Sequence, residues 1–160
     1  MKHLLYNLYI LVVALLISTG CNRNPKNGIR TVTICSTTDL HGAYFDSYYN
    51  EEARLSSLAN VSTYIKQLKK KGVKPVLIDV GDNLQGDNAA YYCNYIDTVS
   101  VHIFARAAEY IGYDAIIVGN HDIEAGHRVY DRFKEGKIPY LAANAIVEGS
   151  DGEPYFEPYT

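Results

Sequence analysis

The sequence predicts an α/β protein, because short runs rich in β-branched residues alternate with longer amphipathic segments along its 160 residues. Three of these runs lead directly into polar clusters that contain Asp, His or Asn. The connections are short, which favours a parallel or mixed sheet with right-handed crossovers. The net charge of −3 and the 48% hydrophobic content are typical of a globular domain and exclude a disordered acidic or basic tail.

The first 20 residues predict an export signal. Lys2 precedes an uncharged apolar run over residues 8–17, and small residues then lead to Cys21. The run is shorter than the about 20 apolar residues that a membrane-spanning helix needs. Its ending resembles a bacterial lipobox, although Ser18 stands where that motif usually has Leu. We therefore predict a lipoprotein-type signal peptide over residues 1–20 with a lipid on Cys21. A plain secreted protein and an uncleaved anchor are the alternatives.

A polar segment over residues 21–30 is interpreted as a tether to a domain over residues 31–160. We expect the protein to be exported to the cell envelope, attached to the membrane by its N-terminal lipid and facing the periplasm. Export would permit a disulfide. Cys35 lies inside an apolar run, however, and Cys93 is distant from it in the sequence, so both are predicted to be unpaired.

The elements of the domain follow from their patterns. Three strands are predicted to start at residues 32, 76 and 115, and their apolar character indicates burial on both faces. The remaining predictions are helices over 51–71, 97–111 and 125–135, an irregular loop over 86–94 and a fourth strand over 138–144.

The first predicted helix shows the periodicity most clearly. Its apolar face contains Leu55, Leu58, Val61, Ile65 and Leu68. Acidic residues begin it, lysines end it, and Gly72 stops it. The second helix is predicted to turn Val101, Phe104, Ala105, Ala108 and Ile111 toward the sheet. Because the lysines complement the helix dipole, they indicate a solvated helix end, and no nucleic-acid polymer is expected as a partner.

The three polar clusters carry the chemistry. They are Asp39-Leu40-His41, Gly81-Asp82-Asn83 and Gly119-Asn120-His121-Asp122. Each cluster alone is weak evidence for a metal site. Asp-x-His on an extended segment points both side chains the same way but also occurs by chance. Gly-Asp-Asn is a common turn sequence. Together they end successive strands at the carboxyl edge of a sheet, where ligands bind. Their oxygen and imidazole donors suit divalent cations, so the sequence predicts metal-assisted hydrolysis.

The motifs Asp-x-His-Gly, Gly-Asp-Asn and Gly-Asn-His-Asp, in this order, resemble those of the calcineurin-like metallophosphoesterases. Segments 78–86 and 119–126 are similar to the exported bacterial branch of 5′-nucleotidases and 2′,3′-cyclic-nucleotide phosphodiesterases. The resemblance covers roughly residues 32–160. It implies the N-terminal half of a layered α-β-β-α metallophosphoesterase sandwich, with a mostly parallel or mixed sheet and helices on one face. The implied activity is metal-dependent hydrolysis of nucleotide phosphoesters or another small phosphoester.

The resemblance also implies roles for individual residues. Asp39 and His41 would bind a first metal, Asp82 would bridge two metals, and Asn120 would bind the second. Asn120 and His121 would contact the substrate, with His121 stabilising the phosphate charge or the leaving group.

An acid three residues after that histidine often orients it in the nucleotidase relatives. Glu124 holds this position here, and Asp122 is the other candidate. Two cations about 3.5–4 Å apart can share a hydroxide, lower its pKa and direct it in line at phosphorus. The mixed nitrogen and oxygen donors admit Mn, Zn, Fe or Co.

The sequence departs from the family in its histidines. The family completes its metal pair with a later isolated histidine and a Gly-His-x-His segment. The five histidines here are His3, His41, His102, His121 and His127, and they form no such segment. The expected C-terminal nucleotide-recognition domain is also missing, so we expect these 160 residues alone to have little or no phosphatase activity. The alternatives are a non-catalytic envelope lipoprotein that binds metal or ligand, and a phosphoesterase of the same fold with a non-nucleotide substrate.

Overall fold

The computed structural model describes residues 30–48, 52–134 and 136–160. The predicted signal peptide, Cys21 and nearly all of the tether lie outside the described residues. The domain corresponds to the compact unit Val32–Thr160. Within the described ranges, no helix combines the length and the apolar character needed to cross a bilayer.

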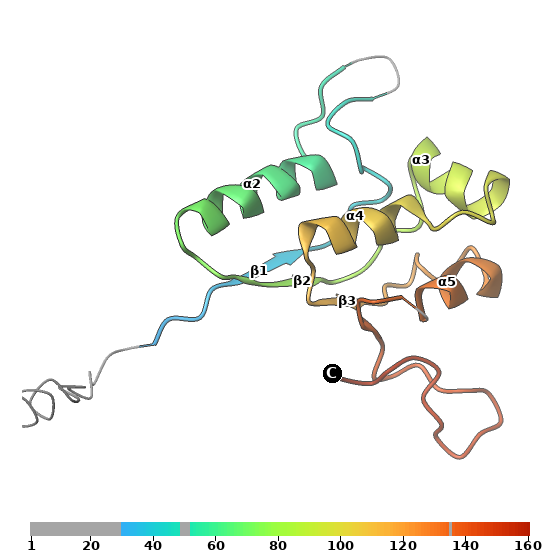
Figure 1. Ribbon diagram of the computed structural model, residues 1–160. Helices are drawn as coiled ribbons and strands as arrows, with labels where there is room; N and C mark the ends of the chain where they lie inside the picture. The colour runs from blue at the N-terminus through green and yellow to red at the C-terminus, as the bar shows by residue number, and fades with distance from the viewer. Residues whose placement is uncertain (1–29, 49–51, 135) are drawn as a thin grey trace, which may run out of the picture. The chain divides into compact units, whose positions relative to one another are not determined.

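Four strands form one sheet in the order β1-β2-β3-β4, and every neighbouring pair is parallel (Figure 1). The elements in chain order are β1 (Ile34–Thr37), α2 (Leu58–Lys70), β2 (Val76–Asp79), α3 (Asn88–Tyr91), the π-helix η1 (Tyr92–Ile96), α4 (Ile103–Ile111), β3 (Ala115–Ile117), α5 (His127–Lys134) and β4 (Tyr140–Leu141). This arrangement confirms the predicted α/β class. Because the strands are parallel, their carboxyl ends all meet one edge of the sheet.

The helices α2 and α4 lie side by side over the same face of the sheet (Figure 1). α2 begins at Leu58, later than predicted, because Ser57 is its N-cap and accepts a hydrogen bond from the Asn60 N–H at 3.2 Å. Leu55 is fully exposed and precedes the helix, so its predicted place on the apolar face was wrong. The first turn also lacks acidic residues. The predicted end was right, since Gly72 follows the last turn with φ of 79°.

α4 also begins later than predicted. His102 is its N-cap, and the imidazole Nδ1 accepts a hydrogen bond from the Phe104 N–H at 3.1 Å. Val101 is 66% exposed and does not face the sheet, contrary to prediction. The preceding region, predicted as a loop over 86–94, instead contains α3 and the start of η1. α5 begins two residues later than predicted, and β4 is only two residues long.

The two faces of the sheet differ at β1 and β2. Leu77 is buried against α2, whereas the paired residues Ile34 and Val76 are 66% and 38% exposed on the opposite face. The prediction that these strands are buried on both faces was therefore wrong. Alternation of exposed and covered positions shows that helices cover one face of this part of the sheet.

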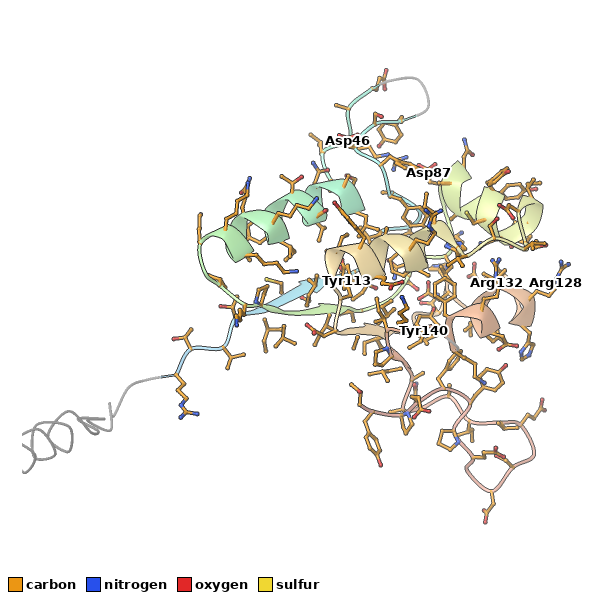
Figure 2. All side chains as sticks on the ribbon, in the orientation of Figure 1. Asp46, Asp87, Tyr113, Arg128, Arg132 and Tyr140 are labelled. Atoms are coloured by element: carbon orange, nitrogen blue, oxygen red, sulfur yellow. The ribbon has the colours of Figure 1, made fainter. Side chains whose placement is uncertain are left out.

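The hydrophobic core lies between the helix-covered face and the helices, where Phe104 packs against Phe133. α5 is tied to the segment before α4 by two arginines (Figure 2). Arg132 donates to the carbonyl oxygens of Cys93 and Ser100, and Arg128 donates to the Thr98 hydroxyl. Both cysteines in the described ranges, Cys35 and Cys93, are free thiols, as predicted.

Candidate metal centre

The loops that follow β1, β2 and β3 meet at the carboxyl edge of the sheet. The first loop is fixed to the second by backbone hydrogen bonds. The Asp39 N–H donates to the Gly81 carbonyl at 3.0 Å, the His41 N–H donates to the Asp82 carbonyl at 2.9 Å, and the Asp87 N–H donates to the His41 carbonyl at 2.9 Å. Segments far apart in the sequence therefore bring their polar side chains to one place.

Three of these side chains converge closely enough to hold one cation. The donor atoms of His41, Asp82 and His121 all lie within 4.8 Å of one another, and all three residues are half-buried. Asp39 Oδ1 lies 3.7 Å from His41 Nε2, so a second carboxylate is adjacent. Two imidazoles and carboxylate oxygens fit a borderline divalent cation. Sequence reasoning brought Asp39, His41 and Asp82 together but did not place the His121 ring among the metal donors.

The backbone at these positions is unusual. Asp39, His41 and Asp82 have φ of 53°, 46° and 61°, and they are the non-glycine residues with positive φ in the described ranges. The Asp-x-His segment is therefore left-handed at both residues and not extended as predicted. A positive φ is uncommon for residues other than glycine, and such residues are found preferentially at functional sites.

His121 has an acid beside it. Its Nδ1 lies 2.7 Å from Glu124 Oε1, an ion-pair distance for a protonated imidazole, although the angles do not satisfy a hydrogen bond. Its backbone N–H donates to Asp82 Oδ1 at 2.9 Å. Asn120, the preceding residue, is exposed.

Asp122 is engaged differently from Glu124. It is fully buried, and its carboxylate accepts hydrogen bonds from four backbone N–H groups. Burial raises its pKa, and these hydrogen bonds act in the opposite direction. The side chain thus contacts the loop backbone, and the acid that lies beside the His121 ring is Glu124.

A second buried carboxylate, Asp79 at the end of β2, supports the second loop. It accepts from the Gly81 N–H at 2.9 Å, from Asn83 Nδ2 and from the Thr37 hydroxyl. Burial raises the pKa of Asp79 against these hydrogen bonds. Asn83, singled out with the metal cluster, is therefore part of the support and is itself fully buried. Nothing in the sequence pattern indicated this network.

Gln85 was also missed. Its Oε1 lies 3.2 Å and its backbone oxygen 3.3 Å from His41 Nδ1. Either oxygen can accept a hydrogen bond from Nδ1–H, and in that tautomer the lone pair of Nε2 is available to a metal. The only signal for Gln85 was its place in the family-like segment 78–86.

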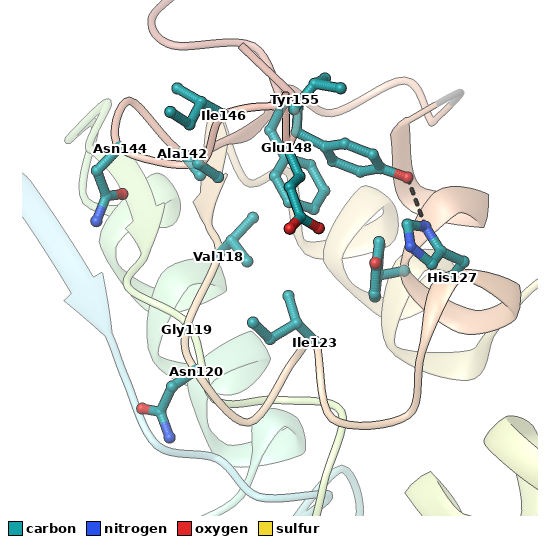
Figure 3. A pocket seen from close by; sticks show the side chains of 14 residues that line it. Val118, Gly119, Asn120, Ile123, His127, Ala142, Asn144, Ile146, Glu148 and Tyr155 are labelled. Carbon is teal, nitrogen blue, oxygen red and sulfur yellow. Dashed lines mark hydrogen bonds between the residues drawn. The ribbon is translucent and has the colours of Figure 1, made fainter. Parts of the chain in front are cut away.

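A pocket of about 710 Å³ opens next to Asn120 (Figure 3). Its walls combine apolar side chains such as Val118 and Ile123 with a His127–Tyr155 hydrogen bond of 2.8 Å. Of the predicted site residues only Asn120 lines it, while His41, Asp82 and His121 lie outside its lining.

Comparison with protein families gives a match over residues 32–157 to Metallophos, the calcineurin-like phosphoesterases. This chain belongs to that family. The match covers nearly the whole described domain and all three polar loops.

Among individual relatives, this chain is 28% identical over 131 residues to a 2′,3′-cyclic-nucleotide 2′-phosphodiesterase/3′-nucleotidase of Yersinia enterocolitica, covering 79% of the chain and 20% of that protein. It is 27% identical over 143 residues to a 5′-nucleotidase of Homo sapiens, covering 84% of the chain and 24% of that protein. The chain thus spans about a fifth to a quarter of the length of these relatives.

Among solved structures, the calcineurin-like phosphoesterase YfkN of Bacillus subtilis superposes with a TM-score of 0.69 at 25% identity. The superposition covers 81% of this chain and 41% of that one. The family uses divalent metals, and the donors of His41, Asp82 and His121 fit such ions.

Proposed function

We propose that this domain forms part of an exported, metal-dependent hydrolase of nucleotide phosphoesters. The observation that carries the proposal is the convergence of His41, Asp82 and His121 at the sheet edge of a phosphoesterase-family chain. Nucleotides are favoured as the substrate class because relatives over most of this domain are named as a cyclic-nucleotide phosphodiesterase/3′-nucleotidase and a 5′-nucleotidase.

The metal centre is proposed to hold two divalent cations drawn from Mn, Zn, Fe or Co. Asp39, His41 and Asp82 would hold the first, and Asp82 with Asn120 would contribute to the second. Bound cations supply Lewis acidity for activating water and the phosphoester. Asp82 Oδ1 already accepts the His121 N–H, so the backbone of the third loop fixes the direction in which this carboxylate faces.

His121 lies within 4.8 Å of the donor atoms of His41 and Asp82, and it is proposed to act on the phosphate beside the metals and not as a metal ligand. A protonated ring donates a hydrogen bond to a phosphoryl or leaving-group oxygen, and this stabilises the negative charge that develops there. The Glu124 carboxylate lies 2.7 Å from Nδ1 and limits rotation of the ring. Asn120 is proposed as a further contact to substrate, and it opens onto a pocket large enough for a small organic group.

The location follows from the N-terminal segment. We propose that residues 1–20 direct export, that a lipid on Cys21 attaches the protein to the membrane, and that residues 21–30 are the tether. A Cys21→Ser variant is expected to move the protein from the membrane fraction to the soluble envelope fraction. Retention of this variant in the membrane would contradict lipid attachment.

The decisive experiment uses the native product, captured from its source cells with an antibody against residues 32–160. Its mass is read first. With Mn²⁺, Zn²⁺, Fe²⁺ or Co²⁺, phosphate release is then measured from 5′-AMP and 3′-AMP, and ring opening of 2′,3′-cyclic AMP to AMP is measured by chromatography. We expect metal-dependent hydrolysis that is lost in a chromosomal Asp82→Asn variant. Metal binding without hydrolysis of any ester would instead establish a binding lipoprotein, and hydrolysis only of other phosphoesters would overturn the nucleotide assignment.

A further inference from the structure

The loops after β2 and β3 exchange hydrogen bonds in both directions. From the second loop, the Asp82 N–H donates to Asp122 Oδ2 at 2.9 Å. The N–H groups of Asn83 and Leu84 donate to Asp122 Oδ1 at 2.7 and 2.9 Å. In return, Asp82 Oδ1 accepts the N–H of His121 at 2.9 Å. Each loop therefore supplies a carboxylate that binds the backbone of the other.

The Asp122 carboxylate is already surrounded by donors, and the buried Tyr140 hydroxyl also interacts with it. A fourth donor, the Gly119 N–H, lies 2.9 Å from its Oδ2. An ionised carboxylate offers about four acceptor positions, and four N–H groups fill them. The side chain is 0% exposed, so water does not compete for these positions. Asp122 is thus unable to bind a metal or a substrate at the same time, and its effect must reach the site through the backbone.

The contact between the loops is also tight. A Cβ added at Gly81 would lie 2.4 Å from the Gly119 nitrogen, and one added at Gly119 would lie 2.2 Å from Asp82 Oδ1. Side-chain atoms cannot enter this contact without moving one loop. The backbone separation of the two loops is therefore set by glycines, and the carboxylate of Asp122 holds it closed.

We infer that Asp122 is a positioning residue that holds Asp82 at a fixed distance from Asn120 and His121 before any metal binds. This inference rests on the proposed function, in which Asp82 and Asn120 contribute to a metal pair. Its physical basis is preorganisation: ligands that are already in place lose less conformational freedom when the ion arrives. Asp122 therefore supports the metal ligands and does not itself bind the metal.

The first test needs no variant. In the metal-free 160-residue chain, amide hydrogen exchange is followed by NMR at residues 82, 83, 84 and 119. Although these residues lie in loops, we expect their amides to exchange as slowly as those of β2. Exchange as fast as in the exposed turn over residues 149–152 would overturn the inference.

The second test compares Asp122→Asn with Asp114→Asn. Asparagine has nearly the same shape, but its Nδ2 is a donor and cannot accept from the N–H groups that faced Oδ1 or Oδ2. Asp114 is the control because its Oδ2 accepts from the Leu77 N–H at 2.8 Å and so links β2 to β3 at the end away from the site. Mn²⁺ affinity is measured by titration calorimetry on chains shown to be folded by their NMR spectra.

We expect Asp122→Asn to bind Mn²⁺ about tenfold more weakly or worse, as is typical when an outer-shell partner is lost. Asp114→Asn should bind like the unaltered chain. Equal affinities for all three chains would overturn the positioning role while leaving the metal centre intact. Absence of Mn²⁺ binding by the unaltered chain would overturn the metal centre itself, and with it the inference. If Asp122→Asn does not fold, the exchange rates of the unaltered chain decide.

Discussion

The loop after β1 differs from the loops after β2 and β3 in how it is held. Two carboxylates that are 0% exposed support the second loop: Asp122 joins it to the third loop, and Asp79 binds groups within it. The first loop presents Asp39 with 59% of its side chain exposed and His41 with 36%, and it is attached to the second loop by hydrogen bonds of the backbone. The side chains of the first loop are therefore more open to solvent than the carboxylates that support the second and third loops, although its backbone is hydrogen-bonded to the second loop.

This difference predicts that changes in the loops affect two separate properties, the stability of the domain and its affinity for metal. Disturbing the second and third loops should lower the stability of the domain, because buried polar groups would lose their partners. Disturbing the first loop should lower affinity for metal and leave the fold intact, because exposed substitutions change stability by less than about 0.5 kcal/mol. Three changes, taken in order of expected effect, test this separation.

The largest effect is expected for Gly81→Ala. The new Cβ would have to sit at φ of 97° and within 2.4 Å of the Gly119 nitrogen. Left-handed backbone and overpacking together are expected to lower the free energy of unfolding by about 3 kcal/mol. Gly152→Ala is the control, since φ there is 84° but no atom lies within 4 Å of the added Cβ. It should cost about 1 kcal/mol in urea unfolding, and equal losses in both variants would contradict the close contact between the loops.

An effect of similar size is expected on acidification, through His102. This buried imidazole supports the second loop: its Nε2 lies 3.1 Å from Asn94 Oδ1, and Asn94 donates to the Leu84 carbonyl. Burial, assisted by the charge of Arg132, lowers the pKa of His102 from 6.5 to about 4. As the pH falls below 6.5 the unfolded chain takes up this proton first, so stability present above pH 6.5 is lost on approaching pH 4. At about 1.36 kcal/mol per unit of pKa difference between the folded and unfolded chain, the free energy of unfolding falls by about 3 kcal/mol.

Urea unfolding at several pH values measures this loss. A His102→Asn variant keeps a side chain suited to the N-cap position but cannot titrate. Its stability should fall less steeply between pH 6.5 and 4 than that of the unaltered chain. Parallel pH profiles would show that His102 does not carry the acid sensitivity.

The smallest effect is expected for Gln85→Ala, which acts on the first loop. Removing the Oε1 that faces His41 Nδ1 leaves the ring with one backbone oxygen as its partner. We expect about tenfold weaker Mn²⁺ binding and an unchanged midpoint of urea unfolding, because Gln85 is exposed. The exposed Gln67→Ala on α2 provides the matched glutamine control. If both variants bound Mn²⁺ equally well, Gln85 would have no part in orienting His41.

The strands and the order of the polar loops could be predicted because both depend on local sequence. A β-branched run such as residues 76–79 and the polar residues after it are adjacent in the chain, and parallel topology then brings such clusters to one edge. Helix starts were harder to predict. Leu55 and Val101 continue the apolar periodicity by chance, whereas the actual starts are set by the caps Ser57 and His102.

The support of the site could not be predicted for a different reason. Asp122 binds N–H groups 38 to 40 residues away, and Asp79 binds the hydroxyl of Thr37 across 42 residues. Such partners leave no periodicity or composition in the sequence. From the sequence, Asp122 is simply an acid beside a histidine, and only the fold reveals which groups occupy its oxygen atoms.

The left-handed backbone at Asp39, His41 and Asp82 has a consequence for laboratory evolution. Each side chain at such a φ costs the folded state about 1 kcal/mol relative to glycine, less where Asp can bond locally. A library at these three positions that is sorted for thermal resistance alone should therefore enrich glycine and lose the metal donors. Sorting the same library for retained metal should restore Asp and His at lower melting temperatures. The two selections would therefore enrich different residues at these positions. The difference in melting temperature between the two sets of variants would measure the stability cost of the metal donors.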